Sequence, residues 1–286
     1  MTTISLHKYH EQIGHLLEDS QFGLAASHCR FILKQHPRHV DTYRLLAKTL
    51  LEEGDLDGAR ELFQRVLSAD PNDYIAHAGL SVVYRAEELL SQALWHLQRA
   101  YEIEPYNGAI QQELRSLYED YAASTKRGKQ ENVDFVVPER LSLTDGALAR
   151  LYIRGELYAQ AIDVLRRALV EDEDRIDLEV LLAETLWLDN QRIDAVQICL
   201  QVLDKLPNCI VANAVLADIW LQTGRIDEAQ DYLQHLVQLT LMDTAHQDLE
   251  SAAGRAFRPE GALVLPAAMT VDRLEDGVDF VSLKRR

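Results

Sequence analysis

A spacing of 34 residues runs through most of this chain and constrains its fold more than any other feature. Pro37, Pro71 and Pro105 lie 34 residues apart, and a later step of the same frame reaches Pro207. In this frame, units begin at Leu6, Val40, Tyr74, Gly108, Ser142, Ile176 and Ile210. A period of this length is typical of stacked two-helix units, because one such unit cannot bury its apolar face alone.

Residue types recur at fixed positions within the frame. Position 8 is small in Ala47, Ser81, Ala149, Ala183 and Ala217, and position 20 is alanine in Ala25, Ala59, Ala93, Ala161, Ala195 and Ala229. Position 11 is large and apolar in Leu16, Leu50, Tyr84, Tyr118, Tyr152, Leu186 and Trp220. Small residues let two antiparallel helices approach closely, while larger apolar residues fill the space between them. The pattern therefore predicts pairs of packed helices.

These positions resemble the tetratricopeptide repeat over about seven tenths of the chain. One stretch alone carries most of the family signature, namely Tyr43, Leu46, Ala47, Leu50, Gly54, Leu56 and Ala59. The resemblance implies an all-α fold, a right-handed α-α superhelix of about six helix-turn-helix repeats in two arrays. It also implies that the first helix of each pair lines a concave groove that binds protein segments.

The fourth unit departs from the pattern, because residues 123–132 lack the alanine and apolar residues that a second helix needs. We therefore expect a break in the solenoid, with an extended segment at Val133–Pro138; the alternative is a half-repeat that has decayed in frame. The predicted organisation is a first array at 1–121 (three repeats and one extra helix), a linker at 122–143, a second array of three repeats at 144–243, and a capping helix and tail at 244–286.

Charge and cysteine content narrow the classes of partner. The 286 residues include 29 Lys and Arg against 46 Asp and Glu, a formal net charge of −17. Nucleic-acid and anionic-membrane binders need a basic surface, so we expect neither kind of partner. Cys29, Cys199 and Cys209 are scattered without CxxC spacing, which indicates reduced thiols. With no apolar signal segment at the N-terminus, the protein is expected to be cytoplasmic.

Enzyme motifs are absent from the sequence, so we predict no catalytic activity and no cofactor. His10 and His15 flank a glutamate in a pattern close to that of zinc proteases. Their spacing of five residues turns the two rings about 140° apart on a helix, so they cannot share one ion. The six histidines in the first 39 residues leave a metal site open, although surface histidines on a polar helix are the favoured interpretation. Cys29 and Cys199 occupy core positions and are expected to be buried.

The family resemblance places positions 2, 5, 6, 9, 12 and 13 of each first helix on the concave face. This face is mixed and partly basic in the first array and largely apolar in the second. An apolar groove implies an occupant, either a partner helix or peptide or this chain's own segment Ala262–Met269. The predicted partner-binding residues are Arg44, Lys48, Arg85, Arg150, Arg154, Val180, Leu181, Glu184, Trp187, Leu188 and Leu221. Core packing is an equal alternative for Trp187.

Taken together, these patterns favour a non-catalytic scaffold or adaptor that binds protein segments in its grooves. The alternative is a constitutive structural or regulatory subunit of a larger enzyme or secretion complex. Chaperone-binding members of the family hold a terminal carboxylate with a Lys-Asn-Asn-Lys-Arg clamp. In the best register Arg44 takes the first Lys, but Lys48 and Gly79 stand where the two Asn belong. Binding of chaperone tails is therefore not predicted.

Overall fold

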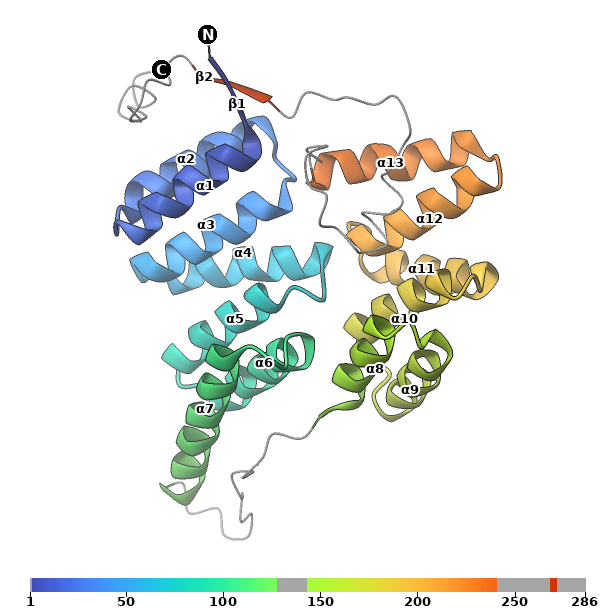
Figure 1. Cartoon of the computed structure of the whole chain (residues 1–286). Helices are drawn as coiled ribbons and strands as arrows, with labels where there is room; N and C mark the ends of the chain where they lie inside the picture. The colour runs from blue at the N-terminus through green and yellow to red at the C-terminus, as the bar shows by residue number, and fades with distance from the viewer. Residues whose placement is uncertain (1, 128–142, 241–267, 272–286) are drawn as a thin grey trace.

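The computed structural model describes residues 2–127, 143–240 and 268–271. Helices account for nearly all of this part of the chain, as the 34-residue frame predicts (Figure 1). The first array contains α1 (Leu6–Glu18), α2 (Phe22–Gln35), α3 (Val40–Glu53), α4 (Leu56–Ala69), α5 (Tyr74–Ala86), α6 (Leu90–Ile103) and α7 (Gly108–Arg127). The second array contains α8 (Asp145–Arg154), α9 (Tyr158–Glu171), α10 (Ile176–Leu188), α11 (Arg192–Lys205), α12 (Ile210–Gln222) and α13 (Ile226–Thr240).

The helices pack in the predicted pairs, and the small residues of the frame lie at the contacts. Every alanine predicted at position 20 is fully buried, and the residues predicted at position 8 are at most 3% exposed. Larger side chains such as Phe63 and Leu165 fill the space between the paired helices. The prediction of an all-α solenoid of helix pairs is confirmed.

The turn within each pair requires an unusual backbone conformation. Position 15 of all six pairs has a positive φ, and glycine occupies it only at Gly54 (φ 84°) and Gly224 (φ 76°). The other four turns place Ser20, Glu88, Glu156 and Asn190 in the same left-handed region. A residue with a Cβ atom is disfavoured in this region, so the solenoid imposes its geometry on these four residues at some cost in stability.

The structure differs from the predicted organisation at two places, and two predicted segments lie outside the described residues. Helix α7 continues to Arg127, six residues past its predicted end, so the start of the predicted linker is helical. A short antiparallel pair, not predicted, joins β1 (Thr2–Ser5) to β2 (Ala268–Val271). The predicted extended segment Val133–Pro138 and capping helix Ala245–Phe257 lie outside the described residues.

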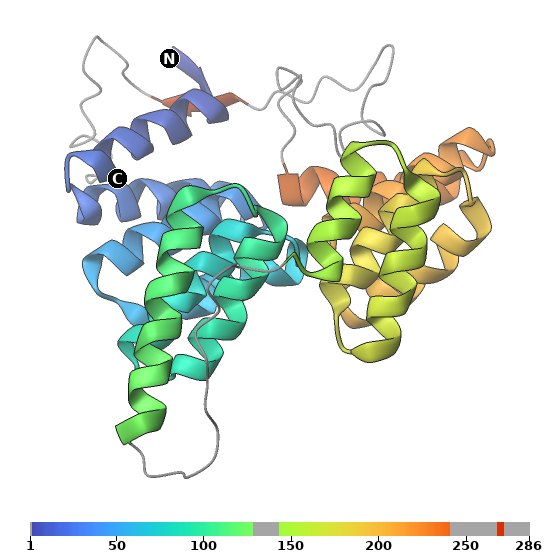
Figure 2. The ribbon, with the colours of Figure 1, turned by 60° about the horizontal axis from the view of Figure 1, so that its bottom comes forward.

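The two arrays lie side by side, and the chain runs through them in opposite directions (Figures 1 and 2). At one end α13 contacts α3, and at the other α8 contacts α6. Leu239 of α13 is buried in the same apolar cluster as Val40 and Ala69 of the first array, and Ile210 packs against that cluster. The arrays therefore share part of one core.

Candidate functional site

The arrays meet along a seam formed by residues 36–39, 70–73 and 102–107 of the first array and 144–154, 175–177, 208–210 and 238–240 of the second. At one end Arg38 donates to Gln238 Oε1 at 2.9 Å. His39 Nδ1 accepts from the Thr42 backbone N–H, so its Nε2–H is the donor to the Thr240 carbonyl at 3.2 Å. Hydrogen bonds from both side chains thus tie the last turn of α13 to the first array.

A buried cluster of charges joins the arrays near the other end of the seam. Arg175 donates from Nη2 to Glu102 Oε2 at 2.9 Å and to Asp177 Oδ2 at 2.7 Å. Glu102, on α6, is only 2% exposed and also forms an ion pair with Arg99 at 2.9 Å. Removing one member of such a cluster leaves an uncompensated buried charge, which costs about 3–5 kcal/mol when no other partner remains.

Helix α8 approaches the same cluster through Gly146. A methyl carbon added at Gly146 would lie 2.6 Å from the carboxyl carbon of Glu102, so only glycine fits this contact without movement. The contact gives a local reason for glycine in the first turn of α8, where helix propensity alone would favour alanine.

Three residues that the sequence predicted as partner contacts, Arg44, Arg150 and Glu184, lie in or beside the middle of the seam, close to Asp70. Arg150 donates to Asn72 Oδ1 at 2.6 Å, and Asn72 donates to the Asp177 carbonyl at 3.2 Å. Arg44 forms ion pairs with Asp73 and Asp41. The two arginines are therefore engaged within the chain.

The acidic side chains around Asp70 outnumber the basic ones. Burial and then the neighbouring Asp73 raise the pKa of Asp70 to about 6. Burial is also the main reason that the pKa of Glu102 rises to about 7. Both carboxyls sit against the second array, so the protonation state of the seam changes close to neutral pH.

The apolar residues predicted in the second groove fall into two classes. Val180 and Leu181 are 1% and 7% exposed and belong to the core cluster of the second array, so they offer no surface to a partner. This departs from the prediction for these two residues, because α10 is packed on several sides by α9, α11 and α12. The apolar residues at positions 5 and 6 of this unit therefore serve core packing.

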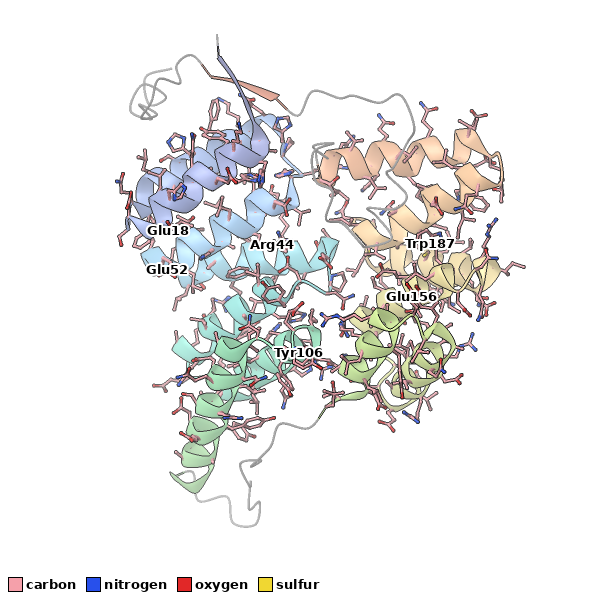
Figure 3. The ribbon with its side chains drawn as sticks, in the orientation of Figure 1. Glu18, Arg44, Glu52, Tyr106, Glu156 and Trp187 are labelled. Atoms are coloured by element: carbon pink, nitrogen blue, oxygen red, sulfur yellow. The ribbon has the colours of Figure 1, made fainter. Side chains whose placement is uncertain are left out.

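Three predicted residues of the second array, Trp187, Leu188 and Leu221, keep part of their surface exposed near the C-terminal ends of α10 and α12. Trp187 donates from its indole Nε1 to Asp218 Oδ2 at 2.7 Å, which joins the C-terminal halves of α10 and α12. Leu221, one turn after Asp218, is 39% exposed. Trp187 and Leu188 are half-buried. We call Trp187, Leu188, Asp218 and Leu221 the α10–α12 rim; Figure 3 labels Trp187 within it.

The other predicted residues differ in how far they are engaged. Arg85 pairs with Glu113 and with Asp120, whereas Lys48 is exposed and makes no ion pair among the described residues. Arg154 is exposed and reaches Glu104 across the seam at 3.5 Å. Arg44, labelled in Figure 3, lies on the first array. The basic face predicted for the first array is thus largely neutralised by its own carboxylates.

The sequence did not predict the seam contacts of Arg175, Glu102 and Gly146. Arg175 stands at the N-cap of α10, where Asp73 caps the equivalent helix α5 by accepting from the Ala76 N–H. Arginine cannot cap a helix in this way, so its presence there is a signal of a second role. Neither its partner Glu102 nor the packing of Gly146 follows from the repeat.

Groups with potential for chemistry have structural roles in the described part of the chain. No cluster of three or more metal-binding side chains occurs there. Cys29 and Cys199 are fully buried, as predicted, and burial raises the pKa of the Cys29 thiol to about 12. His10 donates from Nε2 to Thr42 and stacks on His39. None of the described helices combines the length and apolarity that crossing a bilayer requires.

Comparison with known proteins agrees with this architecture. The family described as "Tetratricopeptide repeat" matches residues 16–81 and 186–253. The chain contains tetratricopeptide repeats. A Caenorhabditis elegans "Cell division cycle protein 27 homolog" is 30% identical over 107 residues, which cover 32% of this chain and 14% of that protein. The chain thus spans about one seventh of this curated relative.

Solved tetratricopeptide structures are similar at low sequence identity. The "TPR2AB-domain:pHSP90-complex of yeast Sti1" is 16% identical, with a TM-score of 0.38, over 80% of this chain and 88% of that one. The "P58(IPK) TPR Domain" is 13% identical, with a TM-score of 0.35, over 87% and 64% respectively. Tetratricopeptide repeats in general mediate protein–protein interactions.

Proposed function

We propose that this protein is a non-catalytic scaffold that binds a segment of a partner protein at the α10–α12 rim. The observation that carries the proposal is the exposure of Leu221 beside Trp187, whose indole is fixed by Asp218. A fixed aromatic side chain next to an exposed aliphatic one is a common arrangement at binding hot spots, because little side-chain entropy is lost on association.

The chemistry of the rim narrows the kind of segment. Asp218 and the nearby Glu184 are acidic, and the second array carries 18 acidic against 8 basic residues between 144 and 243. An apolar side chain contacting Leu221 and Leu188, flanked by Lys or Arg, would match both the surface and its charge. The partner segment in this proposal is therefore apolar and basic.

A site-specific cross-linker tests where a partner binds. A photo-reactive amino acid at Leu221 is compared with one at Leu200, an exposed leucine of α11 in the same array. We expect one dominant protein adduct from Leu221 in extracts of the native host and none of that protein from Leu200. Equal capture at both positions would refute the rim as the binding surface.

A second candidate is that of a permanent subunit of a larger complex, and the edge of the second array favours it. Leu157, Ile193 and Ile226 lie at the turns of three successive helix pairs and are 46%, 85% and 66% exposed. Several large apolar residues exposed at neighbouring turns are typical of stable interfaces. Co-purification of a stoichiometric, salt-resistant partner that Ile193→Asp releases, while Leu221→Asp does not, would favour this candidate.

A further inference from the structure

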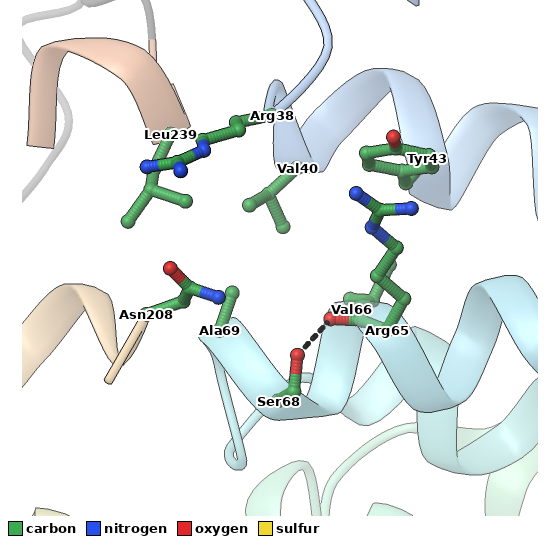
Figure 4. Close-up of a pocket in the computed structure, with 9 residues that line it drawn as sticks. All are labelled: Arg38, Val40, Tyr43, Arg65, Val66, Ser68, Ala69, Asn208 and Leu239. Atoms are coloured by element: carbon green, nitrogen blue, oxygen red, sulfur yellow. Dashed lines mark hydrogen bonds between the residues drawn. The ribbon is translucent and has the colours of Figure 1, made fainter. Parts of the chain in front are cut away.

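A pocket of about 220 Å³ lies at the end of the seam where α13 meets α3 and α4 (Figure 4). Its apolar lining includes Val40, Val66 and Leu239, all of which are buried. Because Leu239 comes from the second array and the valines from the first, the pocket exists only while the arrays are docked. None of the residues predicted to bind a partner lines it.

Two arginines at this pocket have no acidic partner. Arg38 and Arg65 are both exposed, and neither forms an ion pair with a carboxylate among the described residues. Two other arginines of the seam do have acidic partners: Arg175 pairs with Glu102, and Arg154 pairs with Glu104. In a chain with a net charge of −17, two unpaired guanidinium groups at one small pocket form a local basic site.

Neutral groups hold both arginines in place. The Arg65 guanidinium carbon lies 4.3 Å from the centroid of the Tyr43 ring, and Arg38 donates to Gln238 at 2.9 Å. Figure 4 shows the two guanidinium groups on either side of Val40. A positioned guanidinium with free N–H donors is the group that best matches a carboxylate, since it can donate two parallel hydrogen bonds.

A third donor comes from the second array. Burial and then the nearby Arg38 lower the pKa of His235, so its ring is neutral at pH 7. His235 Nε2 bonds to Asn208 Oδ1 at 2.9 Å, which uses the amide oxygen as acceptor. The Asn208 amide nitrogen makes no hydrogen bond in the described part of the chain and remains able to donate.

We propose that this pocket binds a carboxylate attached to an apolar group about the size of one amino-acid side chain. The carboxylate is held by Arg38 and Arg65, with the Asn208 amide as a further donor, and the hydrocarbon rests on Val40 and Leu239. The volume is below the range of about 300–1,000 Å³ usual for larger small-molecule ligands. The C-terminal residue of a peptide and a free small carboxylic acid share this chemistry.

Binding of such a ligand also couples to the arrangement of the arrays. A ligand that contacts Leu239 and Asn208 on one side and Arg65 on the other favours the docked state by mass action. Once the arrays are apart, the carboxylate keeps Arg38 and Arg65 of the first array but loses the Asn208 amide and the apolar contact with Leu239. The site is independent of the α10–α12 rim, so the two proposals fail or succeed separately.

Calorimetric titration of the full chain tests the site with three probes. They are a tetrapeptide ending in leucine with a free carboxylate, the same peptide as its C-terminal amide, and 4-methylpentanoate. We expect saturable binding of one or both acids and binding of the amide at least about tenfold weaker, since hydrogen bonds to charged groups are worth about that factor. Peptide binding alone identifies a C-terminus as the ligand, and binding of 4-methylpentanoate alone identifies a free acid.

Matched variants locate the site. Arg38→Met and Arg65→Met each keep the aliphatic stem and should weaken binding of the acid about tenfold or more. Arg30→Met removes an exposed arginine of α2 that also lacks an ion pair in the described structure, and should leave binding unchanged. No saturable binding of either acid at about 10 mM, equal binding of the amide, or equal loss in Arg30→Met would overturn the proposal.

Discussion

The substitution Gly146→Ala tests the docking of the two arrays with the smallest possible change. Gly146 lies in the first turn of α8, and an added methyl carbon would meet the Glu102 carboxyl group of α6, 2.6 Å from its carboxyl carbon. Glu102 is buried and held by ion pairs with Arg175 and Arg99, so it cannot move aside without breaking them. The added methyl therefore acts on the seam, while the helix itself accepts alanine readily.

The magnitude follows from two opposing effects. Alanine in place of glycine stabilises a helix interior by up to about 1 kcal/mol, and by less in a first turn. Overpacking a close contact costs about 1–3 kcal/mol. We therefore expect the free energy of unfolding to fall by about 1–2 kcal/mol in Gly146→Ala.

A matched glycine provides the control. Gly14 lies in the interior of α1, and an added methyl carbon there meets nothing within 4 Å. Gly14→Ala should therefore raise the free energy of unfolding by about 0.5–1 kcal/mol. Urea unfolding followed by circular dichroism measures both variants, and fluorescence energy transfer between labels on α4 and α11 reports whether the arrays remain docked. A gain in stability for Gly146→Ala similar to that of Gly14→Ala, with unchanged transfer, would refute the seam contact.

Three further predictions concern protonation and backbone strain. Because the pKa of Asp70 is raised from 3.8 to about 6, its contribution to stability is full below pH 4 and is lost as the pH rises through 6. The variant Asp70→Asn keeps the acceptor for the Asn72 N–H. Between pH 4.5 and 7.5, its free energy of unfolding in urea should rise by about 1–2 kcal/mol relative to that of the wild type. Burial lowers the pKa of His10 to about 4, so its contribution to stability is present above pH 6.5 and is lost as the pH falls through 4. Between pH 7 and 4, the free energy of unfolding of His10→Gln should therefore fall by about 1–2 kcal/mol less than that of the wild type. An unchanged pH dependence would contradict this. Glu156→Gly should raise the thermal midpoint, by the equivalent of about 0.5–1 kcal/mol, because position 156 has a φ of 57°; a lower midpoint would show that the Glu156 side chain outweighs the strain.

The repeat frame predicts contacts between neighbouring helices well, because each unit meets the next in the same way. The buried alanines such as Ala59 and the core thiol of Cys29 follow directly from position in the frame. The contacts of the seam do not follow from the frame, because they join residues of different units that occupy unrelated positions in the repeat. Asn72 and Arg150 are 78 residues apart and occupy unrelated positions of the frame.

The same limit explains the mixed outcome for the predicted binding residues. Val180 lies on the predicted groove face, but the stacking of three helices around α10 buries it in the core. Arg150 lies on that face too, and the folding back of the second array engages it with Asn72. Sequence position identifies the face of a helix, whereas only the arrangement of the arrays decides what remains open.

The affinity of the partner segment for two leucine variants tests the scaffold proposal most directly. Leu221 and Leu200 are exposed to similar degrees in the same array, at 39% and 45%, so replacing either with aspartate changes charge and folding alike. With the partner captured at Leu221 purified, we predict that Leu221→Asp lowers its affinity by about tenfold or more while Leu200→Asp leaves it within about twofold. Equal affinity of both variants and the wild type would contradict binding at the α10–α12 rim.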